Sequence, residues 1–138
     1  MTELTRLYRF SAMHRLHAEA LSDAANREVY GKCNNPSGHG HNYLLEVTVR
    51  GPVADVSGQI LDRSELDMLV NRSVLEPFSH ADLNARMERV PTTENLAAEI
   101  RVRLEEHWRK SFDGEWPRLS KIRLYETRKN VCEVDCNE

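Results

Sequence analysis

The 138-residue chain has few cysteines and no long apolar segment. Its three cysteines are Cys33, Cys132 and Cys136. An odd number without an export signal argues against a disulfide framework, so a special thiol here is expected to be reactive or metal-binding. The sequence has no run of about 18 consecutive apolar residues, and its first residues lack the charged-then-apolar pattern of a signal peptide. We therefore expect a cytoplasmic protein with no membrane partner.

The chain also lacks an excess of positive charge. It has 19 Lys and Arg residues against 22 Asp and Glu residues, a formal charge of -3. No basic block is present that could neutralise a row of phosphates, so we expect no nucleic-acid partner. With 40% hydrophobic residues, a chain of this length is expected to form one domain, residues 1–138, with its own core.

Alternation of apolar and polar residues predicts strands at both ends of the chain. It is clearest at 43–49, and weaker patterns predict strands at 4–12, 59–61, 119–126 and 131–136. Strands at both ends with helices between them favour an α+β fold, in which an antiparallel sheet has helices on one face. The uncovered face and edges of such a small sheet predict oligomerisation.

Helical spacing of apolar residues predicts two helices in the middle of the chain. The first begins at a capping-box pattern, Asp62 to Glu65, and is expected to end at Pro77. The second is expected to begin near Thr92 or Thr93. Its predicted buried stripe comprises Leu96, Ala97, Ile100, Leu104 and Trp108.

Two of the six histidines, His39 and His41, stand two residues apart at the start of the clearest strand. At that spacing both imidazoles point to the same side of the backbone. His14 is the best third ligand if the first strand pairs with the strand that starts at Tyr43. Three imidazoles would leave zinc an open fourth position, as in a catalytic site. Two alternatives are that Cys33 completes a structural zinc site, or that the histidines belong to an ordinary polar turn.

Cys33 and Glu126 are the other residues with chemical potential. Cys33 lies in a polar turn beside Lys32, where a nearby metal and a lysine would favour the thiolate as base or nucleophile; the alternative is an ordinary loop cysteine. Glu126 continues the apolar face of a predicted strand. It is therefore either solvated at the sheet end or held to meet a cationic or N–H-rich ligand.

Four segments, in this order, carry a resemblance to a known family. They are F-S-A-M-H-R-L at 10–16, G-K-C-N-N-P-S-G-H-G-H-N-Y at 31–43, V-P-T-T-E-N at 90–95 and Y-E-T at 125–127. Together they resemble the 6-pyruvoyl-tetrahydropterin synthase family. The resemblance implies a tunnelling fold (T-fold), a four-stranded antiparallel sheet with two helices on one face. It also implies that the sheets join into a barrel in a homohexamer, a dimer of trimers.

The resemblance also implies roles for individual residues. Cys33 and His80 would be catalytic, and Glu126 would anchor the pterin ring through N–H bonds from its 2-amino and N3 side. The implied zinc ligands are His14, His39 and His41. The implied pocket residues, contributed at a subunit contact, are Thr92, Thr93 and Glu94, although a helix N-terminus alone is a sufficient reason for these three.

The implied reaction is a zinc-dependent lyase reaction. It converts 7,8-dihydroneopterin triphosphate to 6-pyruvoyl-tetrahydropterin with elimination of triphosphate, and it needs no nicotinamide or flavin. One alternative is 6-carboxy-5,6,7,8-tetrahydropterin synthase of the queuosine and deazapurine pathway, which would release acetaldehyde and triphosphate. An alternative of another class is a non-catalytic zinc-binding or pterin-binding protein.

The sequence departs from the family pattern at Ser79. The family often has Asp-His where this chain has Ser79-His80, and the histidine is expected to exchange protons with the thiol or the substrate. Ser79 can offer a hydrogen bond but no charge. We hypothesise that Asp82 or an acid from a neighbouring chain substitutes, and we expect a pH optimum displaced from that of relatives with the acid.

Overall fold

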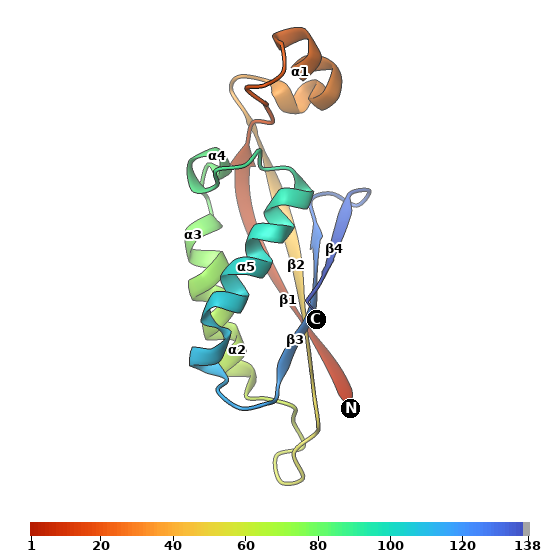
Figure 1. The fold of residues 1–138 in the computed structure, drawn as a ribbon, viewed down its shortest axis with the longest axis vertical. Helices are drawn as coiled ribbons and strands as arrows, with labels where there is room; N and C mark the ends of the chain where they lie inside the picture. Colours follow the sequence, from red (N-terminus) through yellow and green to blue (C-terminus); the bar gives the residue numbers. More distant parts are fainter. Residues whose placement is uncertain (137–138) are drawn as a thin grey trace.

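A computed structural model of the protein describes residues 1–136 and contains one four-stranded antiparallel sheet with helices on one face (Figure 1). The strands, in their order across the sheet, are β1 (Thr2–His14), β2 (His39–Gly51), β3 (Arg118–Tyr125) and β4 (Val131–Asp135). The predicted α+β class and the four longer predicted strands are confirmed.

The longest pairing joins β1 to β2 over the full length of both strands. Phe10 lies opposite Tyr43, and His14 lies opposite His39. His14 was predicted to be the third histidine ligand only if these two strands pair, because the pairing brings His14 to the start of β2. The structure shows this pairing, so that prediction is confirmed.

Helices occupy the segments between β1 and β2 and between β2 and β3. They are α1 (Asp23–Tyr30), the short 3-10 turn η1 (Gly31–Asn34), α2 (Arg63–Val70), the π-helical segment η2 (Asn71–Leu75), α3 (Glu76–Phe78), α4 (Leu83–Arg86) and α5 (Thr93–Ser111). The α2–α3 run and α5 cover one face of the sheet, whereas α1 projects beyond one end of it (Figure 1).

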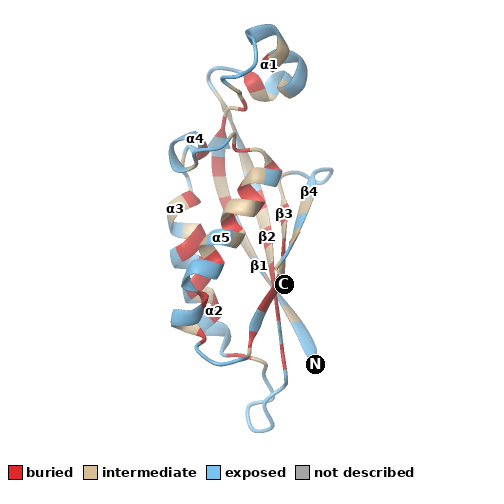
Figure 2. Cartoon of the chain, in the orientation of Figure 1, coloured by how far each residue is buried: buried red, intermediate tan, exposed pale blue. Residues whose placement is uncertain are grey.

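The hydrophobic core lies between the sheet and these covering helices (Figure 2). From β2 it receives Tyr43, Leu45, Val47 and Val49, and from α5 it receives the whole predicted stripe, Leu96, Ala97, Ile100, Leu104 and Trp108. Burying each large apolar side chain contributes roughly 1.5–3 kcal/mol. The opposite face of the sheet is more open, and Leu7 on it is 60% exposed.

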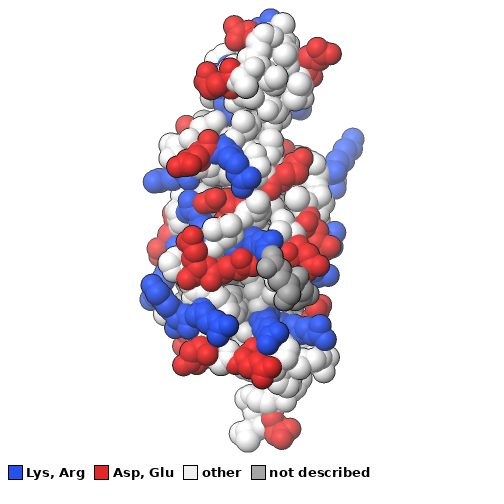
Figure 3. All heavy atoms as spheres, viewed as in Figure 1, with Lys and Arg blue, Asp and Glu red and all other residues white. Residues whose placement is uncertain are grey.

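The surface is of mixed charge. Acidic and basic side chains are interspersed on the face shown in Figure 3. Ion pairs along α5 contribute to this pattern, with Arg101 bonded to Glu105 and Arg103 to Glu99 at helical i,i+4 spacing. Within residues 1–136, no helix is both long and apolar enough to cross a membrane.

One sequence-based expectation about local structure is wrong. Residues 59–61 form a loop, because both neighbours of β2 are already supplied by β1 and β3, and Leu61 is buried there without pairing. The first helical run continues without a break through the π-helical η2 and ends at Phe78, one residue after Pro77, as predicted to within a residue. Pro77 stands in the first turn of α3, where its missing N–H is tolerated.

Candidate metal centre and active site

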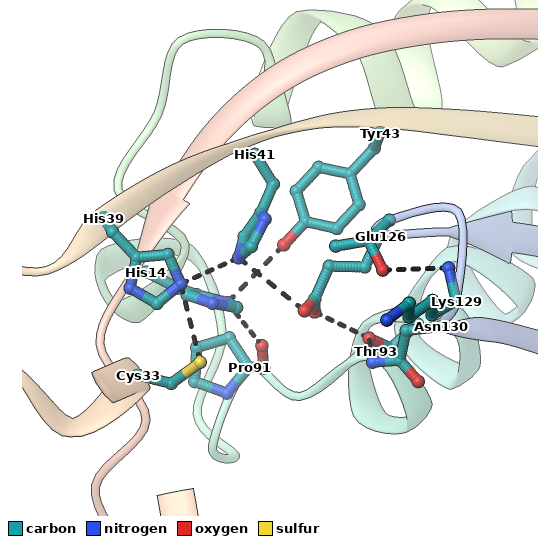
Figure 4. A network of polar contacts seen from close by, with 11 residues as sticks. His14, Cys33, His39, His41, Tyr43, Pro91, Thr93, Glu126, Lys129 and Asn130 are labelled. Atoms are coloured by element: carbon teal, nitrogen blue, oxygen red, sulfur yellow. Dashed lines mark hydrogen bonds and ion pairs between the residues drawn. The ribbon is translucent and has the colours of Figure 1, made fainter. Parts of the chain in front are cut away.

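His14, His39 and His41 form one compact group at the end of the β1–β2 pair (Figure 4). Each pair of rings is arranged edge to face. The ring centroids lie 4.8 Å apart for His14 and His39, 4.8 Å for His14 and His41, and 4.6 Å for His39 and His41. The Nε2 atoms of His39 and His41 are 2.8 Å apart. Strand alternation explains the grouping, because all three residues point to the helix-covered face.

The surroundings of His14 orient it as a ligand. It is buried, and its Nδ1 lies 3.0 Å from the carbonyl oxygen of Pro91. A proton on Nδ1 that is donated to this carbonyl leaves the lone pair on Nε2. Nε2 is buried and has no hydrogen-bond partner among the described residues. A buried nitrogen without a partner that faces two further imidazoles fits a bound cation.

Two of the three rings are also suited to a metal by their charge state. Burial lowers the pKa of His14, and the nearby Glu126 opposes this effect only in part. Burial likewise lowers the pKa of His41, again against the effect of Glu126. Neutral imidazoles are the form that binds a metal ion, so burial favours the ligand form of His14 and His41.

Cys33 approaches this group from the loop before β2. Its Sγ lies 3.5 Å from Nε2 of His39. The loop is held in place because the buried Asn34 side chain donates to the Leu16 carbonyl at 2.7 Å, and the Leu16 N–H donates to the Cys33 carbonyl at 2.8 Å. Gly38 completes the turn at a φ of 72°, where a Cβ atom would lie 3.1 Å from the His14 carbonyl oxygen.

The electrostatic setting of Cys33 differs from the expectation based on Lys32. Burial raises the pKa of the Cys33 thiol, and the negative charge of Glu126 raises it further. Lys32 lowers the pKa but is the smallest of the three influences. The effect of Lys32 is therefore outweighed, and the thiol form of Cys33 is favoured.

Glu126 follows the last residue of β3 and enters the same site. Its Oε1 lies 3.6 Å from Nε2 of His41, and its side chain is 9% exposed. Its Oε2 accepts a 2.6 Å hydrogen bond from the Thr93 hydroxyl. Of the two alternatives left open by the sequence, a solvated sheet end is excluded, because this carboxylate is held inside the site.

Two overlapping groups of side chains could hold a metal ion. One is His14, Cys33 and His39, and the other is His14, His41 and Glu126; in each, the ligand atoms lie within 4.8 Å of one another. Together they contain the three predicted histidines. Imidazole nitrogen with thiolate or carboxylate is a donor set that zinc accepts. The geometry therefore fits zinc, and it allows Cys33 or Glu126 to approach the ion as well.

Some predicted pocket residues have other surroundings. The Thr92 hydroxyl accepts a 3.1 Å bond from the Asn95 N–H and caps α5, as a helix N-terminus alone would explain. Glu94 is exposed. Of the three residues predicted at this helix start, Thr93 is the one that bonds to Glu126.

His80 is not brought to Cys33 within one chain. Its N–H donates to the Ser11 carbonyl at the free edge of β1, and its φ of 58° is in the left-handed region. It lines a cavity of about 320 Å³ with Ser11, Met13, Asn42 and also His41. Cys33 does not line this cavity. Among the described residues, no hydrogen bond or ion pair joins His80 to Cys33.

The substitute proposed for the missing acid has a local structural role. The Asp82 carboxylate accepts a 3.1 Å bond from the Asn84 N–H and caps α4. No ion pair joins it to His80 in the part of the chain that the structure describes. Ser79 precedes His80 and is half-buried.

Two contributors to the site were missed by sequence reasoning. The Pro91 carbonyl, which orients His14, carries no side-chain signal. The buried Tyr43 hydroxyl lies 3.4 Å from Nδ1 of His14, and its ring is 5.8 Å from the ring of His41. Burial raises the Tyr43 pKa, so the phenol remains protonated. Its position two residues after His41 on the same strand was a usable signal.

The sequence of this chain is similar to those of known proteins. A family model described as 6-pyruvoyl tetrahydropterin synthase matches residues 3–137. This chain belongs to that family. The 6-pyruvoyl tetrahydrobiopterin synthase of Poecilia reticulata is 42% identical over 132 residues, which cover 93% of this chain and 86% of the relative.

Structural comparison supports the same membership. The structure of Caenorhabditis elegans 6-pyruvoyl tetrahydropterin synthase superimposes with a TM-score of 0.86 and 36% identity, covering 99% of this chain and 96% of that one. A putative 6-carboxy-5,6,7,8-tetrahydropterin synthase of Archaeoglobus fulgidus is 38% identical over 68 residues, 49% of this chain and 56% of the relative. The resemblance read from the sequence, its T-fold and its class as an enzyme of the synthase family are confirmed.

Proposed function

We propose that this enzyme converts 7,8-dihydroneopterin triphosphate to 6-pyruvoyl-tetrahydropterin with elimination of triphosphate. The observation that carries the proposal is the meeting of a thiol, three imidazoles and a buried carboxylate in one site. Such a site combines a metal-binding group, a candidate base and an acceptor for ring N–H groups. These are the parts that a proton-abstracting lyase acting on a pterin needs.

The zinc ion would be held by His14, His39 and His41. When bound, zinc supplies a Lewis acid beside the hydroxyls of the substrate side chain, which makes the adjacent carbon-bound hydrogen more acidic. Pro91 keeps the His14 proton on Nδ1, so that Nε2 remains available.

Cys33 would act as the base that removes the carbon-bound proton. Its Sγ is near the ligand nitrogen of His39, so a side chain held at this site lies within its reach. Burial of the thiol favours the protonated form in the resting protein. A positive charge in the site would oppose that effect.

Glu126 would anchor the pterin ring. An ionised carboxylate has acceptor capacity only, which matches the adjacent N–H groups of the 2-amino and N3 side of the ring. Thr93 lies beside Glu126 in the same chain, and Thr92 and Glu94 would line the pocket from a subunit contact. No additional nicotinamide or flavin is required, because the oxidation level of the side chain is redistributed into the ring.

His80 would serve Cys33 from a second copy of the chain. Within one chain the cavity that His80 lines does not include Cys33, and His80 lies at the outer edge of β1, where a neighbouring subunit can approach. We propose a homohexamer, a dimer of trimers with sheets joined into barrels, located in the cytoplasm. The exposed strand edges and the open sheet face support assembly.

The alternative product is 6-carboxy-5,6,7,8-tetrahydropterin. The match to the putative carboxy synthase supports this alternative, although that match covers only 49% of this chain. Incubation of the zinc-loaded protein with 7,8-dihydroneopterin triphosphate, followed by mass spectrometry, distinguishes the reactions. A pyruvoyl product supports the proposal, a carboxy product with acetaldehyde supports the alternative, and unchanged substrate contradicts both.

A further inference from the structure

A chain of hydrogen bonds runs from the β3–β4 turn to the carboxylate of Glu126 (Figure 4). Asn130 closes the turn, because its backbone carbonyl accepts a 3.0 Å bond from the Glu126 N–H. Its side-chain amide also donates a 3.2 Å bond to the Thr93 hydroxyl oxygen. The Thr93 hydroxyl lies 2.6 Å from Oε2 of Glu126. Asn130 therefore joins the backbone and the side chain of the Glu126 region through two separate contacts.

The direction of these bonds follows from the chemistry of the groups. A hydroxyl has one proton to donate, and an ionised carboxylate can only accept. The Thr93 proton therefore belongs to the bond with Glu126. The amide nitrogen of Asn130 can only donate, and its N–H occupies a lone pair of the Thr93 oxygen. Because Thr93 is buried, water is poorly placed to replace either bond.

The consequence is that the two carboxylate oxygens of Glu126 are not equivalent. Oε2 is bonded to Thr93, whereas Oε1 is left toward the histidine group, 3.6 Å from Nε2 of His41. We propose that Asn130 is a positioning residue, which acts through Thr93 to set the orientation of the Glu126 carboxylate toward the pterin ring. This inference rests on the proposed role of Glu126 as the ring anchor. It makes Thr93 a second positioning residue rather than a contact of the ring.

The test measures the affinity for unsubstituted pterin, which has the ring but no side chain to meet zinc or the thiol. Fluorescence titration of the zinc-loaded protein gives the dissociation constant. We expect Thr93→Val to weaken binding about tenfold, as for the loss of one hydrogen bond to a charged group, and Thr93→Ser to restore it. Asn130→Ala is expected to weaken binding several-fold, and Arg128→Gln in the same turn is the matched control.

The double variant Thr93→Val with Asn130→Ala separates positioning from a general structural effect. If Asn130 acts through Thr93, the double variant binds pterin no more weakly than Thr93→Val alone. Asn130→Asp has nearly the same shape, but its carboxylate would compete for the Thr93 proton. It is expected to weaken binding more than Asn130→Ala does. Thermal unfolding of each variant shows whether the fold is retained.

Several results would overturn the inference. Wild-type affinity in Asn130→Ala and Asn130→Asp would do so, as would additive effects in the double variant. Either result is informative when the wild type binds pterin and turns over 7,8-dihydroneopterin triphosphate. In that case the role of Asn130 is contradicted and the proposed function is not. Failure of the wild type to do either contradicts the proposed function together with the inference.

Discussion

The Sγ of Cys33 lies 3.5 Å from Nε2 of His39, while Glu126 meets His41 with a separation of 3.6 Å between Oε1 and Nε2. The thiol and the carboxylate thus approach the histidine group at different members, and Figure 4 shows them on different sides of it. A thiol this close to a ligand nitrogen has two conceivable roles, fourth ligand or base. The two roles differ in what removal of the sulfur does to the metal.

Removal of the thiol separates catalysis from metal binding. We expect Cys33→Ala to retain its full zinc content and to lose roughly 10²–10⁴-fold in kcat, because a positioned acid–base group contributes about that much. Zinc is measured by plasma mass spectrometry and kcat by product formation. Parallel loss of zinc and activity would instead make Cys33 a ligand.

Removal of one histidine tests the ligand set. We expect His39→Ala to lose most of its zinc, because two imidazoles remain from a set of three. The matched control is His107→Ala, since His107 is exposed on α5 and should have no effect on the zinc content. Full zinc retention in His39→Ala would rule out the proposed ligand set.

The separation of Cys33 and His80 predicts subunit complementation. Cys33→Ala and His80→Ala should each be nearly inactive alone. Unfolding and reassembling them together should restore part of the activity, since some sites then combine an intact Cys33 with an intact His80 from a different copy. Reassembled samples that stay as inactive as either parent would show that both residues must belong to one chain.

The serine at position 79, where relatives often have an acid, predicts a pH dependence of catalysis that differs from theirs. An acid next to His80 orients a histidine and stabilises its protonated form, which serine cannot do by charge. We expect Ser79→Asp to shift the limb of the pH–rate profile that reports His80 toward higher pH. Ser79→Asn, which adds a similar volume without charge, is the control. An unchanged profile in Ser79→Asp would disprove this role of Ser79.

The bonds of Asp67 predict that part of the free energy of unfolding depends on pH. Its carboxylate receives two bonds from Arg6, at 2.9 and 2.8 Å, and one from the Tyr8 hydroxyl at 2.6 Å, which together tie β1 to α2. The Arg6 bonds are the main cause that lowers the Asp67 pKa. Because the folded pKa lies below the unfolded value, the stabilisation is present above the unfolded pKa and is lost as pH falls through the folded one.

We therefore expect Asp67→Asn to lower the free energy of unfolding by roughly 1 kcal/mol at pH 7, a modest figure because the pair is partly exposed. In urea unfolding, the difference from wild type should stay constant from about pH 8 to 5 and shrink below about pH 4. Asp55→Asn in an exposed loop is the control. A difference that does not depend on pH would mean that lost packing, rather than charge, explains the effect.

Local patterns in the sequence were sufficient for most of the fold. The alternation in β2 and the stripe from Leu96 to Trp108 each predicted a buried face, because a strand or helix needs only its own periodicity to define one. Residues 59–61 show where local patterns fail. This segment had no free strand to pair with, because β1 and β3 already flank β2.

The sequence by itself determined the family, the sheet with its two covering helices, and His39 and His41 as side chains on one face, because these follow from motifs and short-range spacing. Only the tertiary structure decided which distant groups meet them. The Pro91 carbonyl at His14, the Thr93 bond to Glu126 and the position of His80 at the edge of β1 all depend on long-range packing. These contacts join residues far apart in the chain, and they follow from how α5 and the loops lie on the sheet, which short-range spacing does not define.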